Sequence, residues 1–480
     1  MDRMTPTDAG FYFAESRRTP MHVGSVAIFE GPAPSYGDLV RLLLRKLPLV
    51  PRYRQRVRDV PFYLGRPVWT DDEHFQILYH IRHTAVPKPG GPEQLRNLAG
   101  RVLGHRLDLT KPLWELWLIE GLAEGRWAII NKHHHAMIDG VAGTDLMQIL
   151  FDTSPQTTYP APDQWTPRPP ASTTALIASS LSDTVVKPLW ELAAALPAGS
   201  RSAIGSPGQL VRRAGVLAGA LVSAGRQFLT PAAASLNGPI GPHRRWTWAD
   251  STMADVSTVR KAFGGTTNDV VLAAITAGFR DLLEARGELT DGQVVRSMVP
   301  VSIRREDERG VLSNRVSLVY INLPVSEPSP QARLEAVRRQ MDAHKRALRA
   351  YDPRSLIAVL DVIAPGLLAL GTRTLLRSTQ PLVQAVTTNI PGPPVPLYLL
   401  GHRMISLYPC VPIGSGLRTS VGIFSYCGTI TFGINVDFDA VPDVDVLTLG
   451  ISRGMSELVK QAEQKPAEPG ADRRRPKERK

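Results

Sequence analysis

Apolar positions in the first 135 residues follow two different periods. Nearly continuous apolar runs at residues 22–29, 116–120 and 127–132 predict three strands, and the glycine-bounded segment 121–125 predicts a hairpin loop between the last two. Apolar residues between positions 95 and 103 recur instead at a spacing of three and four, which predicts a helix with one buried face. Helices and strands therefore alternate in this part of the chain.

The second half of the chain repeats this mixture of periods. Apolar spacing predicts helices within residues 271–282, 334–348 and 444–458, and apolar runs predict strands at residues 316–323, 419–426 and 429–438. Cys427 and Gly428 lie between the last two strands and predict a tight hairpin turn. Because helices and strands are mixed in both halves, we expect a mixed α/β class with two lobes.

Proline marks the expected boundary between the lobes. Six prolines fall between positions 155 and 170, where the missing N–H donors favour an extended linker. A chain of 480 residues is also too long for one core. We expect an N-terminal lobe at residues 1–152, a proline-rich linker with connecting helices at 153–242, a C-terminal lobe at 243–462, and a charged, disordered tail at 463–480.

Composition and charge narrow the range of functions. The 43% hydrophobic content excludes a wholly disordered chain, and two cysteines, Cys410 and Cys427, cannot form a disulfide framework, which predicts a reducing compartment. The 56 Lys and Arg against 44 Asp and Glu give a net charge of +12, which favours anionic partners. The sequence contains no basic stripe combined with a known reading module, so we expect no nucleic-acid partner.

Two long apolar segments bear on membrane association. Residues 214–225 lie between Arg213 and Arg226, and residues 356–371 are interrupted by Asp361 and Pro365. Both are shorter than the roughly 20 apolar residues of a membrane span, so we expect buried or interfacial helices. The first residues have no apolar signal region. We therefore expect a cytoplasmic protein, peripherally associated with the anionic inner face of the plasma membrane or with lipid droplets.

Candidate chemistry is concentrated in the segment Asn131-Lys-His133-His134-His135-Ala-Met-Ile-Asp139-Gly140. The segment joins a predicted strand to a predicted helix at residues 141–151. An imidazole at a strand end can face a cavity, and its ordinary pKa of about 6.5 lets it accept a proton near neutral pH. Asp139 is positioned to cap the helix or orient the turn, and Gly140 permits a close backbone approach.

Three other interpretations stay open on these residues alone. Asp139 could serve only as a helix cap. On a continuous strand His133 and His135 would share a face and form a possible metal-ligand pair, although the sequence contains no Glu at zinc-peptidase spacing and no further Cys or His cluster. The histidines could also be ordinary core or surface residues. We expect no metal requirement.

The segment from His134 to Gly140 resembles the HHxxxDG signature of the chloramphenicol-acetyltransferase-like, CoA-dependent acyltransferase superfamily. Further segments, from Met4-Thr-Pro-Thr-Asp8 to the last helix, resemble the bacterial wax ester synthase/diacylglycerol acyltransferase family. They are Pro112-Leu-Trp-Glu115, Asn237-Gly-Pro-Ile-Gly-Pro242, Asn268-Asp269, Val299-Pro-Val-Ser-Ile-Arg304 and Asn389-Ile-Pro-Gly-Pro393. The sequence departs from the family at Leu312-Ser-Asn-Arg315, where a glycine is expected before the asparagine, which affects only a turn.

The resemblance implies two similar lobes with an active-site tunnel between them, entered by acyl-CoA from one side and by an alcohol from the other. His135 would be the general base, while Asp139 would hold the loop and pair with an arginine, for which Arg304 is the candidate. Asn268 would stabilise the oxyanion, unless Asn268 and Asp269 only cap a helix beginning at Val270. We expect His134 and Gly140 to support the motif, and Pro112-Leu-Trp114 to pack the lobe.

The family resemblance also implies the reaction. We expect acyl transfer from acyl-CoA, a co-substrate rather than a cofactor, to diacylglycerol, giving triacylglycerol. A fatty alcohol would use the same base and give a wax ester. A carrier-protein-dependent acyltransferase of the same superfamily and a non-catalytic lipid-binding relative are the remaining alternatives.

Overall fold

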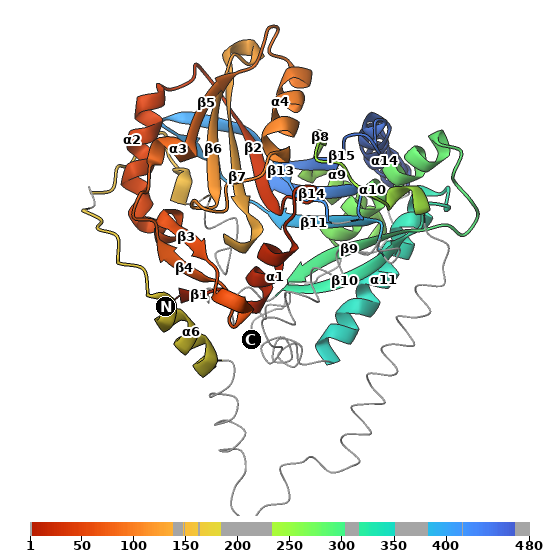
Figure 1. Ribbon diagram of the computed structural model, residues 1–480. Coiled ribbons are helices and arrows are strands. Elements are labelled where there is room, and N and C mark those ends of the chain that lie inside the picture. Colours follow the sequence, from red (N-terminus) through yellow and green to blue (C-terminus); the bar gives the residue numbers. More distant parts are fainter. Residues whose placement is uncertain are drawn as a thin grey trace, which may run out of the picture.

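The computed structural model describes residues 2–137, 147, 149–161, 164–183, 233–302, 316–350, 383–414 and 416–465. Within them, the strands form two six-stranded sheets and one three-stranded sheet, and the two large sheets lie side by side with helices packed on them (Figure 1). This mixed α/β architecture in two lobes confirms the fold class that the sequence predicts.

The first sheet carries the histidine motif on its central strand β7. In spatial order its strands are β12 (Tyr398–Leu399), β13 (His402–Cys410), β2 (His22–Phe29), β7 (Trp127–His134), β6 (Trp114–Glu120) and β5 (Ile81–Ala85). β7 pairs antiparallel with both neighbours, so that His134 lies opposite His22 and His133 lies opposite Trp114. The end of β7 is therefore held from two sides.

Shorter elements surround this sheet. The small sheet consists of β1 (Asp2–Arg3), β4 (Val68–Asp71) and β3 (Gln55–Arg58). The helices are α1 (Pro6–Ala14), α2 (Tyr36–Lys46), α3 (Ile77–His80), α4 (Pro92–Gly104) and α6 (Thr173–Leu181). Single 3-10 turns are η1 (Leu47–Leu49), η2 (Pro51–Arg54), η3 (Pro61–Tyr63), η4 (Ala123–Gly125), η5 (His135–Met137) and η7 (Ala234–Leu236).

Helix α1 begins where local chemistry favours it. The Thr5 hydroxyl accepts a hydrogen bond from the Asp8 N–H, and Pro6 occupies the first helical position, where it loses no hydrogen bond. The helix ends at Ala14, and Glu15 has an extended backbone conformation. Glu15 thus lies between the end of α1 and the first sheet, with Oε2 2.9 Å from His134 Nε2 of β7.

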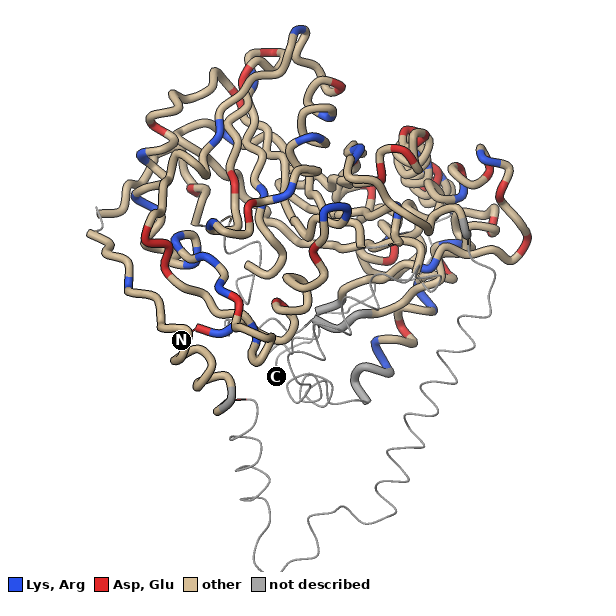
Figure 2. The backbone as a smooth tube through the Cα atoms, in the orientation of Figure 1, with Lys and Arg blue, Asp and Glu red and all other residues tan. Residues whose placement is uncertain are grey.

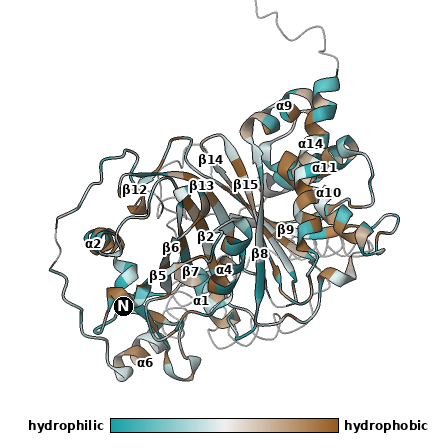
Figure 3. Ribbon diagram, turned by 90° about the horizontal axis from the view of Figure 1, so that it is seen from above, coloured by the Kyte–Doolittle hydropathy of each residue, from teal (hydrophilic) through white to brown (hydrophobic). Residues whose placement is uncertain are grey.

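The second sheet has its helices on one face. Its strands, in spatial order, are β10 (Val316–Leu323), β9 (Val295–Ser302), β11 (Ala385–Pro391), β14 (Thr419–Tyr426), β15 (Thr429–Asp437) and β8 (Arg244–Thr252). The covering helices are α9 (Met253–Phe263), α10 (Thr267–Ala285), α11 (Pro330–Ala350) and α14 (Val444–Gln464) (Figure 3). Apolar residues of α10 and α14 join those of the strands in one buried cluster, which stabilises the lobe by hydrophobic burial.

The two sheets are joined by strand β13, which comes from the second half of the chain but belongs to the first sheet. Hydrogen bonds tie β13 and the residue after it to β15: the Thr431 hydroxyl donates to the Leu407 carbonyl at 2.7 Å, and the Asn435 amide donates to the Val411 carbonyl at 2.8 Å. Trp246 and Trp248 of β8 also enter the cluster on the α4 side of the first sheet. The first sheet is therefore built from both halves of the chain, whereas all strands of the second sheet come from residues 244–437.

Most predicted elements are confirmed, including the strands β2, β6, β7, β10, β14 and β15 and the helices α4, α10, α11 and α14. Cys427 and Gly428 both have positive φ, +44° and +83°, as a type I′ hairpin turn requires. The predicted helices within residues 141–151, 214–225 and 356–371, and the atypical turn at residues 312–315, lie outside the described residues.

The described part of the proline-rich segment is extended and runs along the first lobe. The Arg168 N–H donates to the Asp71 carboxylate at 3.0 Å, and Arg54 lies 5.0 Å over the Trp165 ring. Basic and acidic residues are interspersed over both lobes (Figure 2). Among the described helices, none combines the length and the apolar content needed to cross a membrane.

Candidate active site

The central strand of the first sheet ends in a short turn that carries His135. Strand β7 ends at His134, and His135 is the first residue of η5. The His135 N–H donates to the Met21 carbonyl at 2.7 Å, which ties the turn to the residue before β2. Helix α1 lies against this turn (Figure 1). His135 is therefore held at a strand end, as the sequence predicts for a candidate base.

His134 is fully buried, and both of its ring nitrogens lie close to a polar partner. Its Nδ1 accepts a hydrogen bond from the Ala136 N–H at 3.0 Å, and its Nε2 lies 2.9 Å from Glu15 Oε2. A ring nitrogen that accepts a hydrogen bond carries no proton, so the proton of a neutral His134 lies on Nε2 and faces the carboxylate. The ring of His134 therefore faces Glu15 on one side and the backbone after His135 on the other.

Glu15, directly after α1, accepts hydrogen bonds from several donors. Its Oε1 accepts from Arg106 Nε at 2.9 Å, and its Oε2 accepts from the Met21 N–H at 3.1 Å. Burial raises the pKa of the Glu15 carboxyl, but the contacts with His134 and with the Met21 amide outweigh it and lower the pKa to about 2. Glu15 is thus a buried carboxylate at neutral pH.

His135 stacks on helix α1. The ring centroids of Phe11 and His135 are 3.7 Å apart, with an interplanar angle of 14°. The dense surroundings lower the pKa of His135 to about 4, against the opposing effect of a hydrogen bond to its own backbone, although part of the residue still reaches solvent. His135 is therefore neutral near pH 7 and can accept a proton from a bound hydroxyl.

His133 belongs to a different environment. Its Nε2 lies 2.5 Å from the Tyr53 hydroxyl, and burial lowers its pKa to about 4. Tyr53 in turn stacks on Trp114 at 4.6 Å and accepts a hydrogen bond from Trp114 Nε1 at its carbonyl. The buried Trp114 confirms that the Pro112-Leu-Trp114 segment packs the lobe.

The strand geometry that would make His133 and His135 a metal-ligand pair is not present. Because β7 ends at His134, the alternation of side chains stops before His135. His135 stacks on Phe11 of α1, and His134 faces Glu15 directly after α1, so both rings lie on the side of this helix. Within the described ranges, no group of three or more His, Cys, Asp or Glu side chains could hold a metal ion.

Asn268 and Asp269 lie in the first turn of α10, which begins at Thr267 rather than at Val270. The Asp269 carboxylate accepts from the Thr266 N–H at 2.7 Å, and the Thr266 hydroxyl accepts from the Asp269 N–H, which completes a capping box. The Asn268 amide lies 4.0 Å from Met341 Sδ. No hydrogen bond, ion pair or ring contact in the described part of the chain joins Asn268 to the histidines.

Three predicted site residues, Asp139, Gly140 and Arg304, lie outside the described residues. Conversely, sequence reasoning missed Phe11 and Glu15, which precede the motif by more than 100 positions. The only local signal was the capped start of α1, which marks a helix but does not indicate what the helix contacts. Their role depends on a tertiary contact between α1 and η5.

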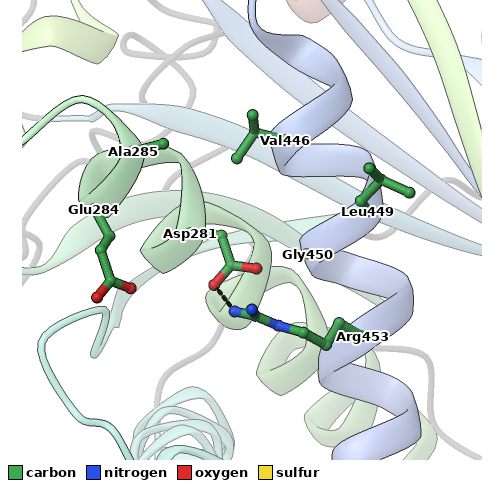
Figure 4. Close-up of a pocket in the computed structure, with 7 residues that line it drawn as sticks. All are labelled: Asp281, Glu284, Ala285, Val446, Leu449, Gly450 and Arg453. Carbon is green, nitrogen blue, oxygen red and sulfur yellow. Dashed lines mark hydrogen bonds and ion pairs between the residues drawn. The ribbon is translucent and has the colours of Figure 1, made fainter.

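A surface depression in the second lobe does not belong to this site. It lies between α10 and α14 and is lined by Asp281, Glu284, Ala285, Val446, Leu449, Gly450 and Arg453 (Figure 4). Arg453 forms an ion pair with Asp281 across it. None of these residues comes from the histidine motif or from α1, and the depression gives no reason to place chemistry there.

The buried histidines predict a loss of stability in mild acid. Burial holds the pKa of His80 and His133 at about 4, whereas the same side chains titrate near 6.5 when unfolded. Between these two pKa values the unfolded chain binds more protons than the folded chain. As the pH is lowered through this range, the free energy of unfolding therefore decreases by up to about 1.4 kcal/mol per pH unit for each histidine. Thermal melts at pH 7.5 and 5.0 should show this decrease, and it should be smaller in His133→Asn. Equal melting temperatures at the two pH values would contradict it.

Two protein-family models together match most of the chain. The wax ester synthase/diacylglycerol acyltransferase catalytic domain matches residues 4–271, and the C-terminal domain of the same family matches residues 312–459. A Mycobacterium tuberculosis protein named as a probable diacylglycerol O-acyltransferase is 38% identical over 463 residues, covering 96% of both chains. A second M. tuberculosis protein with the same description is 30% identical over 470 residues, covering 95% of this chain and 99% of its own.

Solved structures share the two-lobed fold. The wax ester synthase/diacylglycerol acyltransferase of Marinobacter aquaeolei VT8 superimposes with a TM-score of 0.68 at 24% identity, covering 96% of this chain and all of that one. Trichothecene 15-O-acetyltransferase of Fusarium sporotrichioides gives a TM-score of 0.59 at 15% identity, with 95% and 94% coverage. Together with the matched domains and the mycobacterial relatives, the histidine turn on a two-lobed frame leads to one assignment. The chain belongs to the wax ester synthase/diacylglycerol acyltransferase family.

Proposed function

We propose that the protein transfers a long-chain acyl group from acyl-CoA to the free hydroxyl of diacylglycerol, forming triacylglycerol, with His135 as the general base. The observation that carries the proposal is the turn after β7. It presents a partly exposed imidazole whose pKa of about 4 keeps it neutral at physiological pH. The names of the mycobacterial relatives support diacylglycerol as the acceptor.

In the proposed reaction the unprotonated ring nitrogen of His135 takes the proton of the acceptor hydroxyl as its oxygen attacks the thioester carbonyl. A carbon–oxygen bond forms, and the carbonyl oxygen becomes an oxyanion. The carbon–sulfur bond then breaks, and the imidazolium returns its proton to the CoA thiolate. No metal or organic cofactor takes part, and the substrates would meet in a tunnel between the lobes.

Other residues of the motif have proposed supporting roles. Asn268 would donate its amide to the oxyanion, an interaction of about 3 kcal/mol in other acyl-transfer enzymes. Asp139 would hold the loop after His135, paired with Arg304, and Gly140 would allow the loop to turn. Asp269 acts through the helix start, because its carboxylate caps α10.

Product analysis tests the proposal. Purified protein in EDTA is given palmitoyl-CoA with either diacylglycerol or hexadecanol, and the products are separated by thin-layer chromatography. Triacylglycerol as the main product supports the proposal, whereas wax ester in large excess would reassign the acceptor to a fatty alcohol. A parallel reaction with acyl-carrier protein tests the carrier-dependent alternative. No product from any donor and acceptor pair would overturn enzymatic function, and restoration by Zn²⁺ would implicate a metal.

We expect the protein to associate with anionic membrane or lipid-droplet surfaces in a salt-sensitive manner. The motivation is the net charge of +12, since surface attraction of this kind is screened within about 8 Å at physiological salt. Sedimentation with phosphatidylserine vesicles should show binding at 50 mM salt and release at 500 mM, two test conditions bracketing that ionic strength. Neutral phosphatidylcholine vesicles are the control. Binding that survives both high salt and alkaline carbonate would contradict peripheral association.

A further inference from the structure

Two series of close polar contacts lead from one carboxylate oxygen of Glu15 to the backbone around His135. On one side, Glu15 Oε2 accepts from the Met21 N–H at 3.1 Å, and the Met21 carbonyl accepts from the His135 N–H at 2.7 Å. On the other side, Glu15 Oε2 lies 2.9 Å from His134 Nε2, and His134 Nδ1 accepts from the Ala136 N–H at 3.0 Å. The peptide groups on both sides of His135 are therefore tied to Glu15.

The acceptor oxygen of Glu15 selects one tautomer of His134. A carboxylate facing Nε2 favours the tautomer with its proton on that nitrogen, which leaves Nδ1 free to accept from Ala136. The opposite tautomer would lose both contacts, because two acceptors would face each other at Nε2 and two donors at Nδ1. Arg106 Nε, 2.9 Å from Glu15 Oε1, supports the ionised carboxylate.

The same helix end also sets the orientation of the His135 ring. Phe11 lies one helical turn before Glu15 and stacks on His135 at 3.7 Å. A change in the position of the end of α1 would therefore move both the ring and the backbone of the proposed base. A displacement of about 1 Å at a reacting group costs up to about 100-fold in rate.

We propose that Glu15 is a positioning residue of the acyl-transfer reaction, fixing the turn that carries His135 through His134 and Met21. The inference rests on the proposed role of His135 as the base. It assigns His134 a mechanical role, as the link between Glu15 and the turn, while His135 accepts and returns the proton.

Kinetics of Glu15 variants test the proposal. Glu15→Ala removes both contacts at Oε2 and should lower kcat by about 30- to 100-fold, with the KM for palmitoyl-CoA changed less than about threefold. Glu15→Gln keeps one oxygen that can accept from Met21 and His134 and loses the acceptor for Arg106 at the other position, so its kcat should return to within about fivefold of the wild type. A role in folding alone would not produce this division between kcat and KM.

Glu115→Ala is the matched control for the loss of a buried carboxylate. Glu115 lies on the neighbouring strand β6 and pairs with the buried Lys132 at 3.2 Å rather than with a histidine. We expect a lower melting temperature but a kcat per folded molecule within about threefold of the wild type, in contrast to Glu15→Ala. If Glu15→Ala does not fold, Glu15→Asp replaces it, because its shorter side chain cannot reach Met21 and His134 together. It should lower kcat by about tenfold.

The outcomes separate this inference from the proposed function. If His135→Ala is inactive but folded Glu15→Ala or Glu15→Asp keeps a kcat within threefold of the wild type, the positioning role is overturned and the base assignment stands. A kcat for Glu15→Gln as low as that for Glu15→Ala would also overturn it, because the retained oxygen would have no effect. An active His135→Ala would instead overturn the base assignment itself.

Discussion

Replacing His135 with alanine should lower the rate of acyl transfer by about 10²- to 10⁴-fold, which is the usual contribution of a positioned general base. Without the ring nitrogen, the acceptor hydroxyl would have to attack while still protonated. The fold should change little, because His135 is partly exposed and its backbone contact to Met21 does not depend on the side chain. Single-turnover formation of triacylglycerol and a thermal melt of the same sample measure the two effects.

His134→Ala is the informative comparison for this variant. It should keep more activity than His135→Ala, since His134 takes no proton from the substrate in the proposed reaction. It should also be less stable, because it leaves the buried Glu15 carboxylate without one of its donors. If His134→Ala were the inactive variant and His135→Ala worked normally, the base would have to be reassigned. Near-normal turnover in both variants would remove the catalytic interpretation of the motif.

Gly433→Ala should have the largest effect on folding, because it lies where the two sheets meet. A Cβ atom at this position on β15 would lie 1.7 Å from the Pro409 carbonyl oxygen of β13, and a backbone atom cannot move aside as a flexible side chain can. We expect a loss of about 3–5 kcal/mol and a melting temperature lower by about 3–5 °C, or insoluble protein. Differential scanning calorimetry measures the change.

Gly37→Ala provides the control for this substitution. Its added Cβ would meet only Ser35 Oγ, at 3.9 Å, near the start of α2. Alanine is a better helix former than glycine, so this variant should melt at the wild-type temperature or slightly above it. A normal melting temperature for Gly433→Ala would mean that β13 and β15 are not packed as closely as the structure indicates.

Local sequence patterns were sufficient to predict most of the secondary structure. The apolar runs of β2, β6 and β7 and the helical spacing of α4 and α10 are local features that tertiary packing did not override. The helix α10 begins three residues before Val270, because Thr266 and not Asn268 or Asp269 is its cap, and all three residue types are favoured at this position. The family resemblance named His135 as the candidate base, and the structure places this residue directly after the end of β7.

The sequence by itself determined the two-lobed α/β class and the location of the histidine motif, because periodicity and short motifs are properties of neighbouring residues. Only the tertiary structure decided that β13 completes the first sheet from the second half of the chain. It also decided that His134 faces Glu15 and that Phe11 covers His135. Contacts between residues more than 100 positions apart leave no local pattern, because they arise when separate elements pack together and satisfy one another's buried polar groups.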